Sequence, residues 1–302
     1  MPLRRSTLRD RVQNTAIRSV LGAMTLLPYR VRVPFMGWIT ARIAAPLLGW
    51  TTRVRENLAH VMPDLSEDEV RRLTRAVPNN AGRTLIELYS GRAFTERVKD
   101  SPLGGPGLET LRRARAANRP TVVITAHFGS YDAARTVLAA HGHDLGGLYR
   151  EMRNPRFNAH YVNALTLIGA PMFPTTRKGL AGLIGHLRGG GMIGILTDIY
   201  AGAGAPVTFF GKTAPTATSA MEWALKYDAC VIPIYGRRRA NGLDFDIIVD
   251  SEIPQSDPVT MTQAANDSLE AMVRQNMDQW FWIHRRWKPE DQLRRAAART
   301  GP

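Results

Sequence analysis

The sequence predicts an α/β protein with a mixed, mainly parallel sheet flanked by helices and preceded by a helical N-terminal segment. Three observations predict this class. Short apolar runs rich in β-branched residues, such as Thr121-Val-Val-Ile-Thr125, alternate with helical patterns in the second half of the chain. Strand candidates begin only after residue 120, whereas helix signals begin near the N-terminus. A length of 302 residues suits one large core with a smaller helical appendage.

Local signals place the elements in order. Ser66 and Glu69 have the spacing of a capping box, so a helix should run from about 67 to 77, with a second helical pattern at 83–89. The Gly- and Pro-rich stretch 101–107 predicts a linker. Beyond it we expect strands at 121–126, 145–149, 192–197, 229–236 and 243–250, and helices at 132–140, 155–167, 177–188, 216–228 and 260–280.

The chain therefore divides into a basic helical segment over residues 1–100, an α/β domain over 108–290 and a basic tail over 291–302. A hydrophobic content of 44% excludes a disordered protein. The single cysteine, Cys230, cannot form an internal disulfide and falls in an apolar run typical of a buried strand. We therefore expect the body of the protein to face the cytosol.

The formal net charge of +14, from 40 Lys and Arg against 26 Asp and Glu, indicates an anionic partner. Nucleic acid, a phospholipid surface, and an acidic carrier or substrate all meet that description. The charge is concentrated near the N-terminus. Residues 1–55 hold one acid, Asp10, against ten arginines: Arg4, Arg5, Arg9, Arg11, Arg18, Arg30, Arg32, Arg42, Arg53 and Arg55.

The same N-terminal segment is apolar between its arginines. Because Arg30, Arg32 and Arg42 interrupt it, no uncharged stretch reaches the roughly 18 residues of a membrane-spanning helix. Short basic amphipathic helices with Trp38 and Trp50 at their ends are typical of a segment that lies in the headgroup region of an anionic membrane. An ordinary helical subdomain packed on the body explains the pattern equally well, and the two interpretations are compatible.

The run from Thr125 to Asp132 carries the strongest chemical signal, because it places His127 at the end of a predicted strand and Asp132 at the start of a predicted helix. Strand ends are where α/β folds bind ligands. With Gly129 allowing a tight turn, the Asp132 carboxylate can reach one imidazole nitrogen and leave the other free as a base. Such a pair would deprotonate a hydroxyl. The alternative is that His127 caps the strand and Asp132 caps the helix.

Other residues invite two interpretations each. Arg150 follows a predicted strand and could contact a phosphate or a carrier, or be an ordinary surface arginine. Asp198 ends another strand, a position shared by functional carboxylates and helix caps. The loop with Phe210 and Gly211 leads to Thr216, where free amides could hold an anion. Alternatively, the phenylalanines of this loop fill the core.

Several cofactor and nucleophile motifs are excluded. Residues 189–194 satisfy G-x-G-x-x-G but precede a strand, whereas a dinucleotide-binding motif follows one. His141 and His143 lack further ligands, so we expect no metal site. Without a Gly-x-Ser-x-Gly motif, Ser130 is a poor covalent nucleophile.

Taken together, the chain resembles the bacterial lipid A biosynthesis acyltransferases, the lauroyl and myristoyl transferase family of the lysophospholipid acyltransferase-like group. The resemblance covers about residues 50–288 in the family's order. It is carried by Arg55-Glu-Asn57, Met62-Pro-Asp-Leu-Ser66, the box from His127 to Asp132, Tyr149-Arg150, Asn154-Pro155, Asp198, Phe209-Phe-Gly211, Thr216, Thr218 and His284-Arg-Arg-Trp287.

The resemblance implies an enzyme at the cytoplasmic face of the bacterial inner membrane, peripheral or monotopic. It would move a fatty acyl chain from an acyl carrier protein or coenzyme A thioester to a hydroxyl of a lipid A-type glycolipid, with no further cofactor. His127 would take the hydroxyl proton, Asp132 would steady the imidazolium, and the Gly129 or Ser130 amides would hold the oxyanion. The remaining substrate contacts would come from Arg150, Asn154, Asp198, Phe210, Gly211 and Thr216.

Two alternatives stay open. Many lipid A enzymes have Glu at the position of Asp132, Gln at that of Ile199 and Arg at that of Ala170, so the acceptor could instead be a glycerophospholipid or another glycolipid, such as a phosphatidylinositol mannoside. A basic nucleic-acid-binding protein is the other class. Against it, the arginines interleave with apolar stretches and no nucleic-acid module appears, so we expect no nucleic acid partner.

Overall fold

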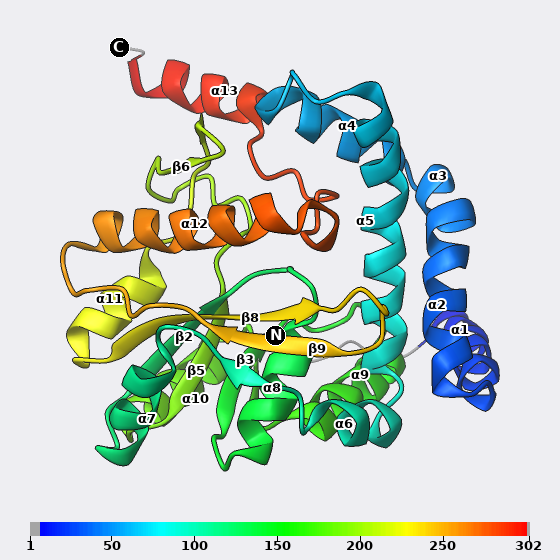
Figure 1. Cartoon of the computed structure of the whole chain (residues 1–302), viewed down its shortest axis with the longest axis horizontal. Coiled ribbons are helices and arrows are strands. Elements are labelled where there is room, and N and C mark those ends of the chain that lie inside the picture. Colours follow the sequence, from blue (N-terminus) through cyan, green and yellow to red (C-terminus); the bar gives the residue numbers. More distant parts are fainter. Residues whose placement is uncertain (1–6, 301–302) are drawn as a thin grey trace.

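The computed structural model describes residues 7–300, with side chains as far as Arg294, and shows a seven-stranded sheet between helices (Figure 1). The strand order is β1-β9-β8-β2-β5-β3-β4, and only the β8–β9 pair is antiparallel. The predicted fold class is therefore confirmed. The sheet consists of β1 (Leu103–Gly104), β2 (Thr121–Thr125), β3 (Leu145–Tyr149), β4 (Met172–Pro174), β5 (Met192–Leu196), β8 (Cys230–Arg238) and β9 (Phe245–Val249).

Helices cover both faces of this sheet, which explains why every residue of β2 is buried. Val123 packs in the hydrophobic cluster between the sheet and the first helical layer. Val122 and Ile124 pack in the cluster between the sheet and the second layer. The first layer includes α6 (Arg92–Val98), α7 (Leu108–Ala116), α8 (Tyr131–Ala140) and α9 (Pro155–Ile168). The second includes α10 (Arg177–Arg188), α11 (Ser219–Lys226) and α12 (Pro258–Gln275).

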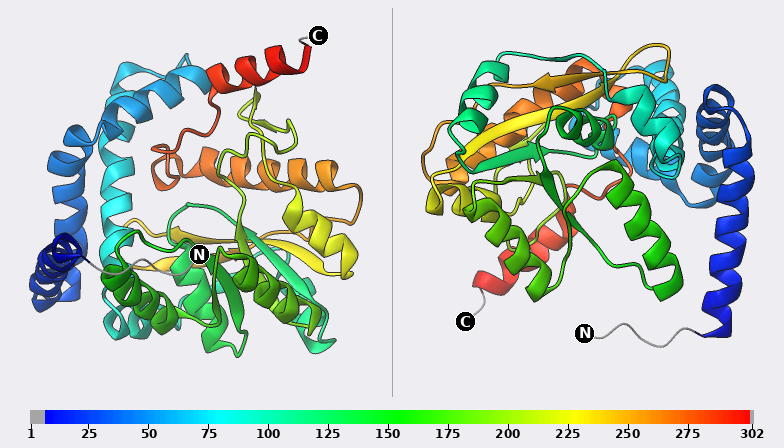
Figure 2. Two further views of the ribbon diagram at one scale, coloured as in Figure 1. Left: turned by 180° about the vertical axis from the view of Figure 1, so that it is seen from behind. Right: turned by 90° about the horizontal axis from the view of Figure 1, so that it is seen from below.

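The N-terminal helices form a wall at one end of the sheet. They are α1 (Leu8–Leu26), α2 (Tyr29–Ile39), the π-helical turn η1 (Thr40–Ala44), α3 (Ala45–Leu47), α4 (Trp50–Val61) and α5 (Glu67–Leu88). Helix α5 stands against the sheet end, and α1 and α2 lie outside it (Figure 2). Among the described residues, no helix combines the length and the apolar character that crossing a membrane requires.

Helix α5 differs from expectation, because the sequence predicts a break near Pro78 and the structure shows one helix. A proline removes only one backbone hydrogen bond from a helix. Leu73 and Val77 are buried on one face of α5 and Ile86 is buried on another, and this tertiary burial outweighs the local cost.

The C-terminal region also differs. Helix α12 ends at Gln275 rather than near 280, and the short 3-10 turn η2 (Met277–Gln279) follows. The expected basic tail instead forms helix α13 (Pro289–Thr300), while residues 301–302, like Arg4 and Arg5, lie outside the described part of the chain.

Short strands were missed at β1, at β4 and in the hairpin of β6 (Thr208–Phe209) and β7 (Lys212–Thr213). Strand β1 falls inside the predicted linker, where Gly105 and Gly107 pass so close to the β9 end that an added Cβ would strike backbone oxygens of Val249 and Asp250. Gly105 and Gly107 thus serve close packing. The division of the chain into domains stays a prediction.

Candidate active site

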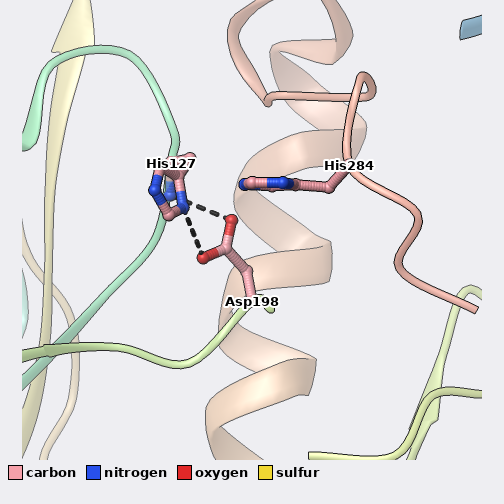
Figure 3. A group of neighbouring side chains, drawn as sticks. All are labelled: His127, Asp198 and His284. Carbon is pink, nitrogen blue, oxygen red and sulfur yellow. Dashed lines mark hydrogen bonds and ion pairs between the residues drawn. The ribbon is translucent and has the colours of Figure 1, made fainter. Parts of the chain in front are cut away.

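The parallel pairing of β2 with β5 brings two polar side chains together. Thr125 and Leu196 are partners in this pair, and the chain leaves the sheet at the same edge beyond each of them. His127 and Asp198 each lie two residues past that point, and their side chains face each other (Figure 3). The fold therefore produces a histidine–carboxylate pair from segments 71 residues apart.

Asp198 is completely buried and accepts hydrogen bonds on both oxygens. Its Oδ1 lies 3.0 Å from His127 Nδ1, and its Oδ2 accepts from the His127 backbone amide at 2.9 Å and from Trp280 Nε1 at 3.0 Å. Because an ionised carboxylate only accepts, His127 carries its proton on Nδ1 and leaves the lone pair of Nε2 free. The side chain of His127 is 27% exposed, so this nitrogen can meet a substrate.

The pair is strongly coupled. Burial alone would lower the pKa of His127, but the Asp198 carboxylate outweighs burial and raises that pKa above its ordinary value. Burial alone would raise the pKa of Asp198, yet the His127 charge and hydrogen bonds hold it well below its usual range. Asp198 is therefore ionised, and it stabilises the protonated imidazole.

Asp132 is not the partner of His127, which corrects the pairing expected from the sequence. It is the second residue of α8, and its Oδ1 accepts from Arg135 at 2.8 Å, one helical turn along. Arg135 also donates to the backbone oxygen of Gly169 at 2.7 Å. Burial raises the pKa of Asp132 even beside this guanidinium. The Asp132–Arg135 ion pair thus ties α8 to the end of α9.

The two expected oxyanion amides are also occupied. The Gly129 amide donates to the oxygen of Gln279 at 2.8 Å, and the Ser130 amide donates to the oxygen of Gly236 at 2.9 Å. These bonds hold the segment after β2 against its neighbours, so neither amide is available to a substrate oxygen. The Ser130 hydroxyl caps α8 by accepting from the Ala133 amide.

The Asn154 side chain makes structural contacts through both its oxygen and its nitrogen. Its Oδ1 accepts from the amides of Arg156 and Phe157 and caps α9, and its Nδ2 donates to the backbone oxygen of Asp10 at 2.9 Å. Asn154 therefore joins α9 to α1. The expectation that it binds substrate is not supported by these contacts.

The loop with Phe210 and Gly211 packs its phenylalanine side chains into the core, and Gly211 lies exposed at its turn. Both residues have positive φ in the two-residue turn of the β6–β7 hairpin, and Phe210 packs on Trp282. Thr216 is fully buried, and its hydroxyl accepts from Arg286 at 2.6 Å. The core-filling interpretation of this segment is the one that the structure supports.

His284 was named with a family motif but was not proposed as a site residue. Its ring centroid lies 4.6 Å from that of His127, and its buried Nε2 has no hydrogen-bond partner within the described structure (Figure 3). Burial, with the nearby His127 charge, lowers the pKa of His284 to about 4, so this ring stays neutral. Among described residues, nitrogen and oxygen atoms of His127, Asp198 and His284 lie within 4.8 Å of one another, a grouping that could hold a metal ion.

His284 is placed by the segment that leads to it. Phe281 donates its amide to the His127 oxygen at 2.9 Å, and Asn57 on α4 donates to the backbone oxygens of Trp282 and His284 at 2.6 and 2.8 Å. Trp280, Trp282 and Trp287 are fully buried, so the aromatic segment docks inward rather than at a wet surface. From the sequence, the only sign that Asn57 helps to position His284 is that Asn57 belongs to the residues that carry the family resemblance.

Two cavities meet at His127. The apolar cavity, of about 380 Å³, is walled by β2, β3, β5, α8 and α9 and is lined mainly by aliphatic side chains. The connecting cavity, of about 250 Å³, lies between α5, the segment after β2 and residues 279–281. His127, Tyr131 and Tyr161 border both. Arg150 lines the apolar cavity, whereas Asp132 lines the connecting one.

The family model described as Bacterial lipid A biosynthesis acyltransferase matches residues 10–289 of the chain. The chain belongs to this acyltransferase family. Membership identifies the chain as an acyltransferase.

Curated members of the family align along most of the chain. The lipid A biosynthesis lauroyltransferase of Escherichia coli (strain K12) is 24% identical over 276 residues, covering 89% of each chain. The lipid A biosynthesis palmitoleoyltransferase of the same strain and the lipid A biosynthesis acyltransferase of Shigella flexneri are each 24% identical over 279 residues, again covering 89% of each chain. The two E. coli relatives are named for different acyl chains.

Proposed function

We propose that this protein transfers a fatty acyl chain from an acyl carrier protein or coenzyme A thioester to a hydroxyl of a lipid A-type glycolipid, with His127 and Asp198 as the catalytic pair. One observation carries the proposal. His127 exposes Nε2 where an apolar cavity meets a second cavity, while Asp198 holds Nδ1. The names of the family relatives support the glycolipid acceptor.

The reaction follows from this geometry. His127 Nε2 removes the proton of the acceptor hydroxyl, and the oxygen attacks the thioester carbonyl to form a tetrahedral intermediate. The carbon–sulfur bond then breaks, and the imidazolium returns its proton to the leaving thiolate. Asp198 stabilises the imidazolium between the two transfers. General base catalysis of this kind supplies about 10²- to 10⁴-fold in rate.

The apolar cavity suits the acyl chain. Val123, Leu145 and Leu196 line it from neighbouring strands, and Leu165 lines it from α9, so a hydrocarbon chain there would bury apolar surface against aliphatic side chains. A volume of about 380 Å³ lies in the range of ligand-binding cavities. Arg150 lines the same cavity and is exposed, so we keep it as a contact for the carrier or for a phosphate of the donor.

Because the Gly129 and Ser130 amides are occupied, the oxyanion must be stabilised by other hydrogen-bond donors. Tyr131 and Tyr161 border both cavities, and the Tyr131 ring lies 5.9 Å from that of His127. Burial raises the pKa of both tyrosines, so their hydroxyls stay protonated and can donate. We propose that these hydroxyls bind the developing negative charge.

The N-terminal helices suit attachment to the cytoplasmic face of the inner membrane. Large apolar side chains on α1 to α3 are exposed, among them Leu26 at 86% and Leu47 at 80%. Arginines lie between them, as in helices that bind an anionic lipid surface. Such a position would give the site direct access to membrane lipids.

A transfer assay tests the proposal. Purified protein with a radiolabelled acyl donor should acylate a lipid A precursor, and His127→Ala should abolish transfer while its melting temperature stays near that of the wild type. Efficient transfer by the folded variant would refute His127 as the base. A glycerophospholipid and a phosphatidylinositol mannoside, offered in the same assay, identify the acceptor; preference for either would refute the lipid A assignment.

A further inference from the structure

A third cavity, of about 950 Å³, lies between η1, α5, η2 and the turn after β8. We name it the arginine cavity, because its lining holds seven arginines against two acids. These residues are Arg42, Arg71, Arg72, Arg75, Arg83, Arg238 and Arg239, with Asp68 and Asp278. A concave lining of this charge attracts anions.

The arginines of α5 occupy one face of that helix. Arg71, Arg75, Asn79 and Arg83 follow one another at intervals of four residues, the spacing that aligns side chains along a helix. Leu73 and Val77 fall on the opposite side of α5 and are buried. The helix therefore buries its apolar face and turns a row of donors toward the cavity.

Three of these guanidinium groups have no carboxylate partner. Four arginines of the cavity form ion pairs: Arg71 with Asp68, Arg72 with Glu69, Arg238 with Glu87 and Arg239 with Asp246. Arg42, Arg75 and Arg83 pair with no acid within the described part of the chain; Arg83 donates instead to Asn79 and to the backbone oxygen of Gly242. Burial and the Arg238 charge lower the pKa of Arg83. A bound anion would relieve this unbalanced charge.

The arginine cavity adjoins the connecting cavity. Asn80 and Gln279 line both it and the connecting cavity that contains His127. Asn80 donates to the backbone oxygen of Asp278 at 2.9 Å, and Gln279 exchanges two hydrogen bonds with the Arg238 backbone at 2.7 and 2.8 Å. These bonds fix the wall between the two spaces. A ligand held among the arginines would thus lie next to the connecting cavity, which His127 lines.

The cavity also borders the exposed apolar surface. Trp38 lines it, is 51% exposed and stacks on Phe35 with ring centroids 6.2 Å apart. If the N-terminal helices lie on a membrane, the arginines stand at headgroup depth. A hollow of this size accommodates a small anionic group better than it does the surface of a carrier protein.

We infer that the arginine cavity binds a phosphate group of the acceptor glycolipid and thereby orients its hydroxyl toward His127. The inference rests on the proposed function. Arg42 and Arg75, exposed and without acidic partners, supply the free donors, and guanidinium groups bind phosphate oxygens two at a time. This contact favours phosphorylated acceptors, because an acceptor without phosphate leaves the positive charge of the arginines without a partner.

A comparison of acceptors tests the inference with the double variant Arg42→Ala/Arg75→Ala of the full chain. With a phosphorylated lipid A precursor, its kcat/KM for the acceptor should fall roughly ten- to a hundredfold, because charge-assisted hydrogen bonds are lost, while the donor KM stays near wild type. With the same precursor after phosphatase treatment, wild type and variant should have equal kcat/KM values. Arg113→Ala/Arg188→Ala, which removes two exposed arginines of α7 and α10, is the charge-matched control and should change none of them.

Two results would overturn the inference while leaving the proposed function standing: an equal loss on both acceptors, or a rise in the donor KM alone. A calorimetric titration with glucosamine 1-phosphate needs no turnover. Binding to the wild type that is lost in the double variant supports the cavity even if no acyl transfer is found, in which case the proposed function fails by itself. Equal binding by both proteins contradicts the phosphate site.

Discussion

Asp198 is held in its ionised form by three hydrogen bonds, two of which come from His127 itself. Because the backbone amide and the ring of His127 both bond to this carboxylate, the imidazole has little freedom to turn. Trp280 completes the shell and keeps water away from the second oxygen. A base prepared in this way needs no rearrangement when the hydroxyl arrives.

The pH dependence of transfer follows from this pair. Because Asp198 raises the pKa of His127, the imidazole loses its proton above the ordinary value of about 6.5. Only the neutral imidazole accepts a proton, so kcat/KM should fall as pH drops through that raised pKa. A pH–rate profile whose acidic limb lies below pH 6 would contradict the coupling.

The sequence indicated His127 but assigned it the wrong carboxylate. Asp132 lies five residues away, and short spacing made it the obvious partner, yet its place in the first turn of α8 directs it to Arg135. Asp198 was predicted as a strand terminus and as a substrate contact, not as the partner of His127. Its pairing depends on β2 and β5 being neighbours, and strand order is not written in local sequence patterns.

At the scale of elements, strands β3 and β5 shape the apolar cavity through a pair of glycines. Gly147 and Gly194 are partners across these strands, and both line the cavity. A Cβ at Gly194 would lie 3.3 Å from Leu145, another lining residue. The absence of side chains here leaves room above the sheet that larger residues would occupy.

Filling this room should shorten the accepted acyl chain. We expect Gly194→Val to lower transfer of the longest accepted chain by about tenfold or more relative to a chain several carbons shorter, because each excluded CH₂ forfeits roughly 0.8 kcal/mol. Competition between mixed donors, read by mass spectrometry of the product, measures this ratio. Gly104→Val on edge strand β1, where an added Cβ meets no atom within 4 Å, is the control. An unchanged ratio in folded Gly194→Val would exclude the acyl chain from this cavity.

Most elements of the sheet and its helices were predictable, because the periodicity and the β-branched runs of buried strands are strong local signals. The exceptions have tertiary causes. Continuity of α5 across Pro78 depends on buried contacts, and the inward fold of residues 280–287 depends on partners such as Asn57 and Phe209. The oxyanion assignment failed for a related reason, since only the structure shows which carbonyls take the Gly129 and Ser130 amides.

For the molecule as a whole, charge and apolar exposure coincide at the N-terminal helices. Ten large apolar side chains between residues 8 and 48 are exposed: Leu8, Val12, Val20, Leu26, Val31, Phe35, Trp38, Ile43, Leu47 and Leu48. A soluble monomer rarely leaves so many together. The arginine cavity borders this surface, because the exposed Trp38 also lines the cavity.

Binding to lipid vesicles should depend both on the positive charge and on the exposed apolar side chains of the N-terminal helices. Flotation with anionic vesicles should fall as salt is raised from about 0.1 to 1 M, because screening weakens the arginine–lipid attraction. Trp38→Ser/Leu47→Ser should weaken binding further without changing the melting temperature, since both residues are exposed. Leu167→Ser, at an exposed position of α9, is the matched control. Equal binding to neutral and anionic vesicles at every salt concentration would rule out the polybasic contribution.

The measurement that tests the account most directly compares acyl transfer by Asp198→Asn and Asp132→Asn, each corrected for its folded fraction. Asp198→Asn should lose about 10²- to 10⁴-fold in kcat, because the imidazolium loses its carboxylate. Asp132→Asn removes the charge that faces buried Arg135, so it should lower the melting temperature while the folded molecules keep most of their activity. Near-wild-type kcat in Asp198→Asn, with the large loss in folded Asp132→Asn instead, would contradict the assignment of Asp198 as the partner of His127.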